Sequence, residues 1–120
     1  MAKRCIAFDF EDADKAWEHM NYEIIKDYGD FAPNGNLLHI WDDGKRMLAR
    51  CRTCDAYILI QKSEFHSFTD DDDSYYTDFF PVQDEEEAER LNELYSGFEI
   101  ERVFPERYLC RTNYEYHWSK

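Results

Sequence analysis

The fold is decided by residues 45–61, KRMLARCRTCDAYILIQ. Residues 56–61 are rich in β-branched and aromatic side chains, which predicts a strand. Just before the segment, residues 42–44 (Asp-Asp-Gly) predict a tight turn, because glycine takes a positive φ there at little cost. Residues 45–50 then form a strand that runs back from a strand at 36–41. The sequence therefore predicts a hairpin at 45–61 with Cys51-Arg52-Thr53-Cys54 at its tip.

The C-x-x-C pair indicates metal coordination rather than redox chemistry. A redox pair normally opens a helix, whose N-terminus stabilises the thiolate. Here a strand follows Cys54, and a hairpin tip directs backbone amides at both sulfurs. The stretch resembles one half of a zinc ribbon or zinc knuckle, although Asp55 stands where those families usually have Gly. The resemblance implies a structural zinc ion.

A structural zinc ion takes four ligands, and a second C-x-x-C is absent from the sequence. Cys110 is the best third ligand, because it repeats the Cys-Arg-Thr context of Cys51. Cys5 is the fourth, on a predicted terminal strand. The predicted zinc ligands are thus Cys5, Cys51, Cys54 and Cys110. The alternatives to Cys5 are His39, then His66 and His117. It also stays open that Cys5 and Cys110 are ordinary buried thiols.

The rest of the chain predicts an α+β fold, a mostly antiparallel sheet with two helices. Hydrophobic spacing near 3.6 predicts a helix over 13–28, with Asp12 as its N-cap and Gly29 at its end. Asp84 caps a second helix over 85–95, with Glu87 placed as in a capping box. The remaining predicted strands are 4–8, 76–82, 98–104 and either one strand or a strand pair over 107–118.

Length and composition limit the class of protein. A chain of 120 residues is one domain by the usual size of domains, so we expect residues 1–120 to form a single zinc-stabilised α+β domain. Hydrophobic residues make up 43% and aromatics 18%, which excludes disorder of the whole chain. No apolar run approaches the ~20 residues of a membrane helix, and the start does not read as a signal peptide. We expect a cytoplasmic protein of a bacterial host cell, where disulfides rarely persist.

The negative charge is concentrated in one third of the chain. The formal net charge is −13, and residues 63–101 carry all of it. Such a protein is repelled by phosphate backbones and by anionic membranes, so we expect neither direct nucleic-acid nor membrane binding. A focused negative face steers a basic partner. The alternative is a solvated face that only aids solubility.

Carboxylates spaced along a loop and the following helix can imitate a row of phosphates. Tyrosines beside them favour an interface, where tyrosine is a frequent hot-spot residue. The predicted partner-binding residues are Asp70, Asp71, Asp72, Asp73, Tyr75, Tyr76, Asp78, Glu85, Glu86 and Glu89.

In size, charge distribution and lack of catalytic motifs the chain resembles the small acidic anti-CRISPR proteins of phages and mobile elements, especially inhibitors of Cas9-type effectors. The resemblance implies a non-enzymatic inhibitor, expected to be a monomer, that binds a basic surface of the nuclease. It acts by blocking nucleic-acid loading, or by contact with another lobe. The alternatives are an immunity protein against a nuclease toxin, and a zinc-dependent enzyme or regulatory module.

Overall fold

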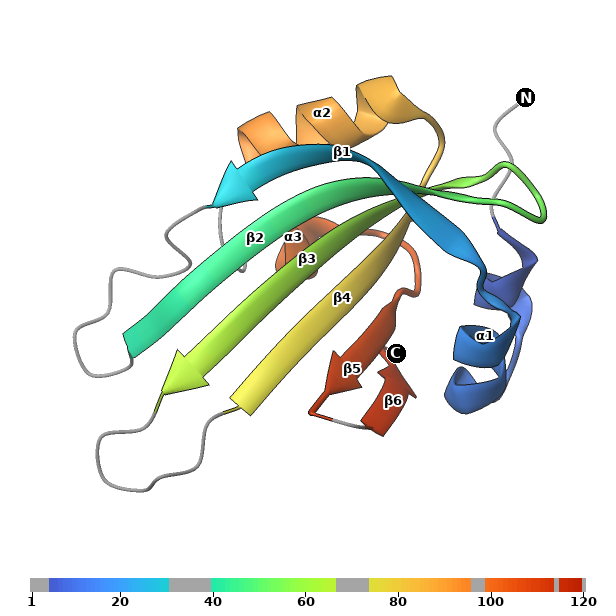
Figure 1. Cartoon of the computed structure of the whole chain (residues 1–120), viewed down its shortest axis with the longest axis horizontal. Helices are drawn as coiled ribbons and strands as arrows, with labels where there is room; N and C mark the ends of the chain where they lie inside the picture. Colours follow the sequence, from blue (N-terminus) through green and yellow to red (C-terminus); the bar gives the residue numbers. More distant parts are fainter. Residues whose placement is uncertain (1–4, 31–39, 67–73, 96–98, 114, 120) are drawn as a thin grey trace.

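The computed structural model describes residues 5–30, 40–66, 74–95, 99–113 and 115–119. Within them six strands form one antiparallel sheet, ordered in space as in the chain (Figure 1). The strands are β1 (Tyr22–Asp30), β2 (Ile40–Cys51), β3 (Tyr57–His66), β4 (Ser74–Val82), β5 (Leu109–Thr112) and β6 (Glu115–Trp118). The helical elements are the 3-10 helix η1 (Ile6–Asp9), α1 (Ala13–His19), α2 (Glu85–Leu94) and α3 (Glu99–Val103). The predicted α+β class is confirmed at this level.

Both faces of the sheet are buried. On one side, the α1 face, the sheet residues pack against η1 and α1; they include Met47, Ala49, Ile58, Ile60, Phe79 and Leu109. On the other side, the α2 face, they pack against α2 and α3; they include Leu48, Leu59, Phe80 and Val82. Side chains alternate between faces along a strand. Burial on both sides therefore explains why the central strands are continuously apolar.

The two predicted helix starts are confirmed. Asp12 accepts a hydrogen bond from the backbone N–H of Asp14 at 2.9 Å and caps α1. The carboxylate of Asp84 accepts from the N–H of Glu87 at 2.8 Å, and Glu87 accepts in turn from the N–H of Gln83 at 2.9 Å. These two bonds place α2 at the predicted position, with Glu87 accepting from Gln83 rather than from Asp84 itself.

The predicted helix over 13–28 is wrong in its second half. Helix α1 ends at His19, and residues 22–30 are the edge strand β1. The adjacent β-branched residues Ile24 and Ile25 suit a strand, and pairing with β2 satisfies the backbone of this segment. Gly29 does have a positive φ of 89°, but it lies at a register shift in β1 rather than at a helix end.

The predicted strand over 98–104 is also wrong in its described part, which begins at residue 99. Residues 99–103 form α3, which packs the fully buried Ile100 on the α2 face. Phe104 donates its N–H to the carbonyl of Ile100 at 3.0 Å, so the two apolar residues share one side of a helical turn. A five-residue stretch with charges between apolar residues fits both periods, and packing decides between them.

Two further predictions are wrong. The predicted strand over 4–8 is replaced, in its described part, by η1. The predicted turn at 42–44 lies inside β2, where the pairing with β3 shifts between Trp41 and Asp43. A turn signal can be absorbed as a bulge when both flanking segments continue one strand.

The C-terminal segment is a strand pair, one of the two predicted forms. β5 and β6 pair across a turn at Asn113, whose φ is 56°. The predicted strands over 56–61 and 76–82 correspond to β3 and β4. Of the predicted strand over 36–41, residues 36–39 lie outside the described residues.

Candidate functional site

Three of the four cysteines meet at one end of the sheet on the α1 face. Cys5 precedes η1, Cys51 ends β2, and Cys54 lies in the turn that leads to β3. Their sulfur atoms all lie within 4.8 Å of one another. Cys5 and Cys51 are fully buried, and Cys54 is partly buried. We call this group the cysteine cluster; its spacing and donor set can hold a metal ion.

The turn between β2 and β3 shapes the cluster. Cys51 donates its N–H to the carbonyl of Ala56 at 2.8 Å, and its own carbonyl accepts from the N–H of Asp55 at 2.8 Å. Asp55 has a φ of 61°, the left-handed conformation that glycine usually supplies. Aspartate tolerates this conformation better than most residues, so the turn closes without a glycine.

The Cys51 sulfur is surrounded by backbone donors. Burial alone raises the pKa of this thiol, but N–H groups of Cys54, Thr53 and Asn21 outweigh burial and lower it to about 7. The side chain of Cys54 donates to the same sulfur and lowers its pKa further. The arrangement stabilises a thiolate, which is the form that ligates metals. The sequence predicted backbone donors at both sulfurs of the C-x-x-C pair, and the donors found in the structure surround Cys51.

Cys5 differs from Cys51 although the two lie together. Burial, followed by the hydrogen bond to Cys54, raises the pKa of Cys5 to about 12. A bound cation deprotonates a coordinating thiol and so reverses this effect. Zinc is the metal whose structural sites are most often built from thiolates, usually in sets of four N or S ligands. The cluster supplies three of them from described residues.

Cys110 does not join the cluster. It lies on β5 next to Asp78 of β4, and its side chain packs on the α2 face. Two strands, β3 and β4, lie between β2 and β5 in the sheet. The predicted set of four cysteines is therefore not brought together. His117 lies near Thr112, with 3.1 Å between its Nε2 and the Thr112 hydroxyl. His39 and the side chain of His66 lie outside the described residues.

The predicted partner-binding residues separate into three groups. Asp70, Asp71, Asp72 and Asp73 lie outside the described residues. Glu85 and Glu86 are exposed on α2, and Glu89 is partly exposed there. Tyr75 is 52% exposed, whereas Tyr76 is partly buried. Asp78 is only 7% exposed and points into a cavity, so it does not belong to an exposed acidic surface.

Helix α2 presents acids outward from the sheet. Ala88, Leu91 and Tyr95 pack on the α2 face as predicted, which leaves the opposite side of the helix to solvent. Lys26 of β1 hydrogen-bonds Glu89 and lies 3.5 Å from Glu85, and the bond to Glu89 raises the pKa of Lys26. Among the described residues, neither Glu86 nor Glu93 forms an ion pair. We call Glu85, Glu86, Glu89 and Glu93 the α2 acids.

Comparisons with protein-family models, with curated proteins and with solved structures gave no match. Among the described helices, none has the length and apolar character needed to cross a bilayer. The chain's own residues therefore carry the functional inference.

Proposed function

We propose that this protein is a non-enzymatic inhibitor that binds a basic surface of a nucleic-acid-processing protein through the α2 acids. The observation that carries the proposal is the orientation of α2: its apolar side is buried on the sheet and its carboxylates face solvent. A rigid helix holds these charges in fixed positions. Such a surface attracts a basic partner over a distance, and the attraction weakens as salt increases.

The first partner class to test is a Cas9-type nuclease, with nuclease toxins second. Both have basic surfaces that contact nucleic acid, and a surface of this kind accepts carboxylates in place of phosphates. Occupation of that surface blocks loading of nucleic acid. The inhibitor needs no catalytic group of its own, so binding alone accounts for the function.

We propose further that the cysteine cluster holds a structural zinc ion. Support comes from the proximity of three sulfurs and from the backbone donors around Cys51. The ion joins the segment before η1 to the turn after β2, two regions that are distant in the chain. A fourth ligand completes the site, and we propose His39 for it, which the sequence analysis gave as the first alternative to Cys5.

A charge-matched pair of variants tests the partner surface. Glu86→Gln with Glu93→Gln removes two of the α2 acids, while Glu18→Gln with Glu115→Gln removes two exposed acids from α1 and β6. Binding to a purified Cas9-type effector is measured by calorimetry at about 0.05 M and about 0.5 M salt. We expect only the α2 variant to weaken binding, at low salt above all. Equal effects of both variants, or failure of wild type to bind either partner class, contradict the proposal.

A further inference from the structure

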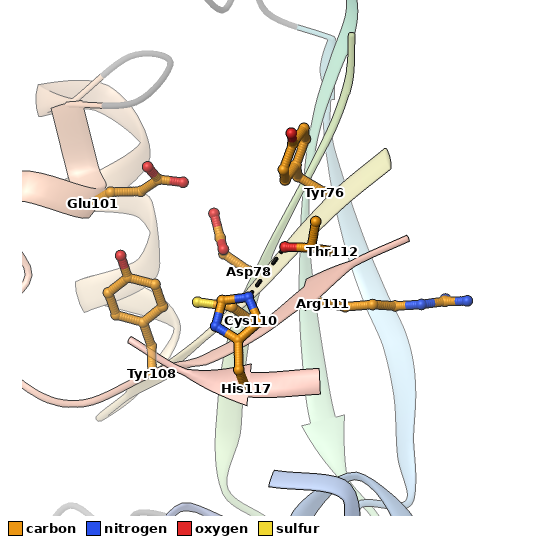
Figure 2. A pocket seen from close by; sticks show the side chains of 8 residues that line it. All are labelled: Tyr76, Asp78, Glu101, Tyr108, Cys110, Arg111, Thr112 and His117. Atoms are coloured by element: carbon orange, nitrogen blue, oxygen red, sulfur yellow. Dashed lines mark hydrogen bonds between the residues drawn. The ribbon is translucent and has the colours of Figure 1, made fainter. Parts of the chain in front are cut away.

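A second set of polar side chains gathers on the α2 face, away from the cysteine cluster. A cavity of about 440 Å³ opens between β4, α3 and the β5–β6 hairpin (Figure 2). Its walls include Tyr76, Asp78, Glu101, Tyr108, Thr112 and His117. Cavities of this size bind small ligands or single side chains when a few polar groups converge inside them. We call it the carboxyl cavity.

Two carboxyl groups converge in this cavity from distant parts of the chain. Asp78 comes from β4 and Glu101 from α3, and Figure 2 shows their carboxyl groups pointing toward one another. Burial, and then the adjacent carboxyl group of Glu101, raise the pKa of Asp78 to about 9. Because a nearby carboxylate and burial both disfavour ionisation, Asp78 retains its proton at neutral pH.

Within the part of the chain that the structure describes, the groups around the cavity do not neutralise the pair. Burial, with added repulsion from Asp78, raises the pKa values of Tyr108 and Cys110. The side chain of Arg111 extends away from the carboxyl groups in Figure 2, and its Nε donates to the carbonyl of Asn113 at 2.7 Å. His117 is engaged with Thr112. A cavity with two acids and two tyrosines is complementary to a cation.

We propose that the carboxyl cavity binds a guanidinium or ammonium group, held between the carboxylates of Asp78 and Glu101 and bounded by the tyrosines Tyr76 and Tyr108. Hydrogen bonds between a cation and carboxylates are stronger than neutral ones, and a planar guanidinium can engage two acids at once. Aromatic faces attract cations as well. Binding ionises the carboxyl pair, and the displaced proton passes to the solvent. The site does not require the α2 acids to bind a partner.

Agmatine, which carries both a guanidinium and an ammonium group, is a suitable probe. We expect saturable one-to-one binding by calorimetry, with release of a proton and with affinity that rises between about pH 7 and about pH 9. Asp78→Asn and Glu101→Gln each weaken binding at least about tenfold, because each removes a charged partner. Asp14→Asn, an exposed acid on α1, leaves it unchanged.

The Asp78→Asn variant keeps the fold, because an amide replaces a carboxyl group that is already protonated at neutral pH; an unchanged thermal melt verifies this. The proposal is overturned if wild type shows no saturable binding at millimolar agmatine. It is equally overturned if Asp78→Asn and Glu101→Gln bind as wild type does.

The same variant identifies the source of the cation. Loss of both agmatine and effector binding in Asp78→Asn assigns the site to an arginine or lysine side chain of the partner. Loss of agmatine binding alone assigns it to a free small cation; both results support the cavity. Glu86→Gln with Glu93→Gln retains agmatine binding, so failure of the proposed function and failure of this site are distinguishable.

Discussion

Cys51 and Cys110, which lie on opposite faces of the sheet, have opposite electrostatic surroundings. On the α1 face, backbone N–H groups converge on Cys51 and lower its pKa to about 7. On the α2 face, burial and then Asp78 raise the pKa of Cys110 far above its ordinary value. Cys51 therefore favours the thiolate form that ligates metals, whereas Cys110 stays a neutral thiol. Backbone donors, more than the residue type, decide which of these two thiols favours the thiolate in the absence of a metal.

Removal of a cluster sulfur has the largest expected effect. Cys51→Ser should lose the metal and destabilise the fold by more than about 4 kcal/mol, because binding of structural zinc is coupled to folding. The melting temperature should fall by more than about 10 °C, and a chelator should lower that of wild type similarly. Cys110→Ser is the matched control and should retain most of the stability. Similar losses in both variants contradict the comparison.

The pH dependence of stability tests whether Asp78, on the α2 face, is protonated in the folded protein. Asp78 has a folded pKa of about 9, well above about 3.9 for an unfolded aspartate. Between these values the folded chain holds a proton that the unfolded chain releases, so stability falls as pH rises through this window. The contribution is at most about 1.4 kcal/mol per pH unit.

Asp78→Asn should remove this contribution, and its denaturation midpoint should fall less than that of wild type from about pH 5 to about pH 9. Asp14→Asn controls for the loss of an acid elsewhere. Parallel curves for wild type and Asp78→Asn are incompatible with a protonated Asp78.

Arg107 stabilises the packing on the α1 face, and a substitution there tests how much its contacts contribute. Its guanidinium donates to the carbonyls of Phe8 and Phe10 at 2.6 and 2.7 Å and lies 3.8 Å from the Trp118 ring centre. Arg107→Lys should cost about 1–2 kcal/mol in urea unfolding, because an ammonium cannot reproduce the paired bonds and the stacking. Arg102→Lys, at an exposed position on α3, should have no measurable effect. An equal cost at both positions excludes this role for Arg107.

Removal of the hydrogen bond that caps α2 has the smallest expected effect on stability. Asp84→Ala removes the cap of α2 and should cost about 1 kcal/mol by urea unfolding. Restoration of stability by Asp84→Ser would tie the loss to capping, since serine is an equally good cap. No loss in Asp84→Ala would show that tertiary packing alone fixes the start of α2.

Local signals predicted the elements they specify directly. The capping box at Asp84 and Glu87 predicted α2, and the β-branched run at 56–61 predicted β3. The segments at 22–30 and 99–103 were misassigned, because each pattern fits more than one period. Pairing with β2 decides the first segment and burial of Ile100 decides the second. Contacts of that kind are not visible in a local window.

The residues of the candidate sites were also predicted only in part. The C-x-x-C turn and Cys5 come together as predicted, since spacing and chemistry are readable in the sequence. Cys110 was misplaced, because its Cys-Arg-Thr context says nothing about which face of the sheet a side chain takes. The face that a side chain takes depends on the pairing register of its strand, and a shift of one residue moves the side chain to the opposite face. Glu101 and Tyr108 were missed as cavity residues, since the helix that carries Glu101 was predicted as a strand.

The most direct test of the account is the zinc content of the protein as purified, measured by elemental mass spectrometry for wild type, Cys51→Ser and Cys110→Ser. We predict one zinc ion per chain in wild type and in Cys110→Ser, and none in Cys51→Ser. Wild type without metal, or a loss of zinc in Cys110→Ser as large as that in Cys51→Ser, would contradict the assignment of the metal to the α1 face.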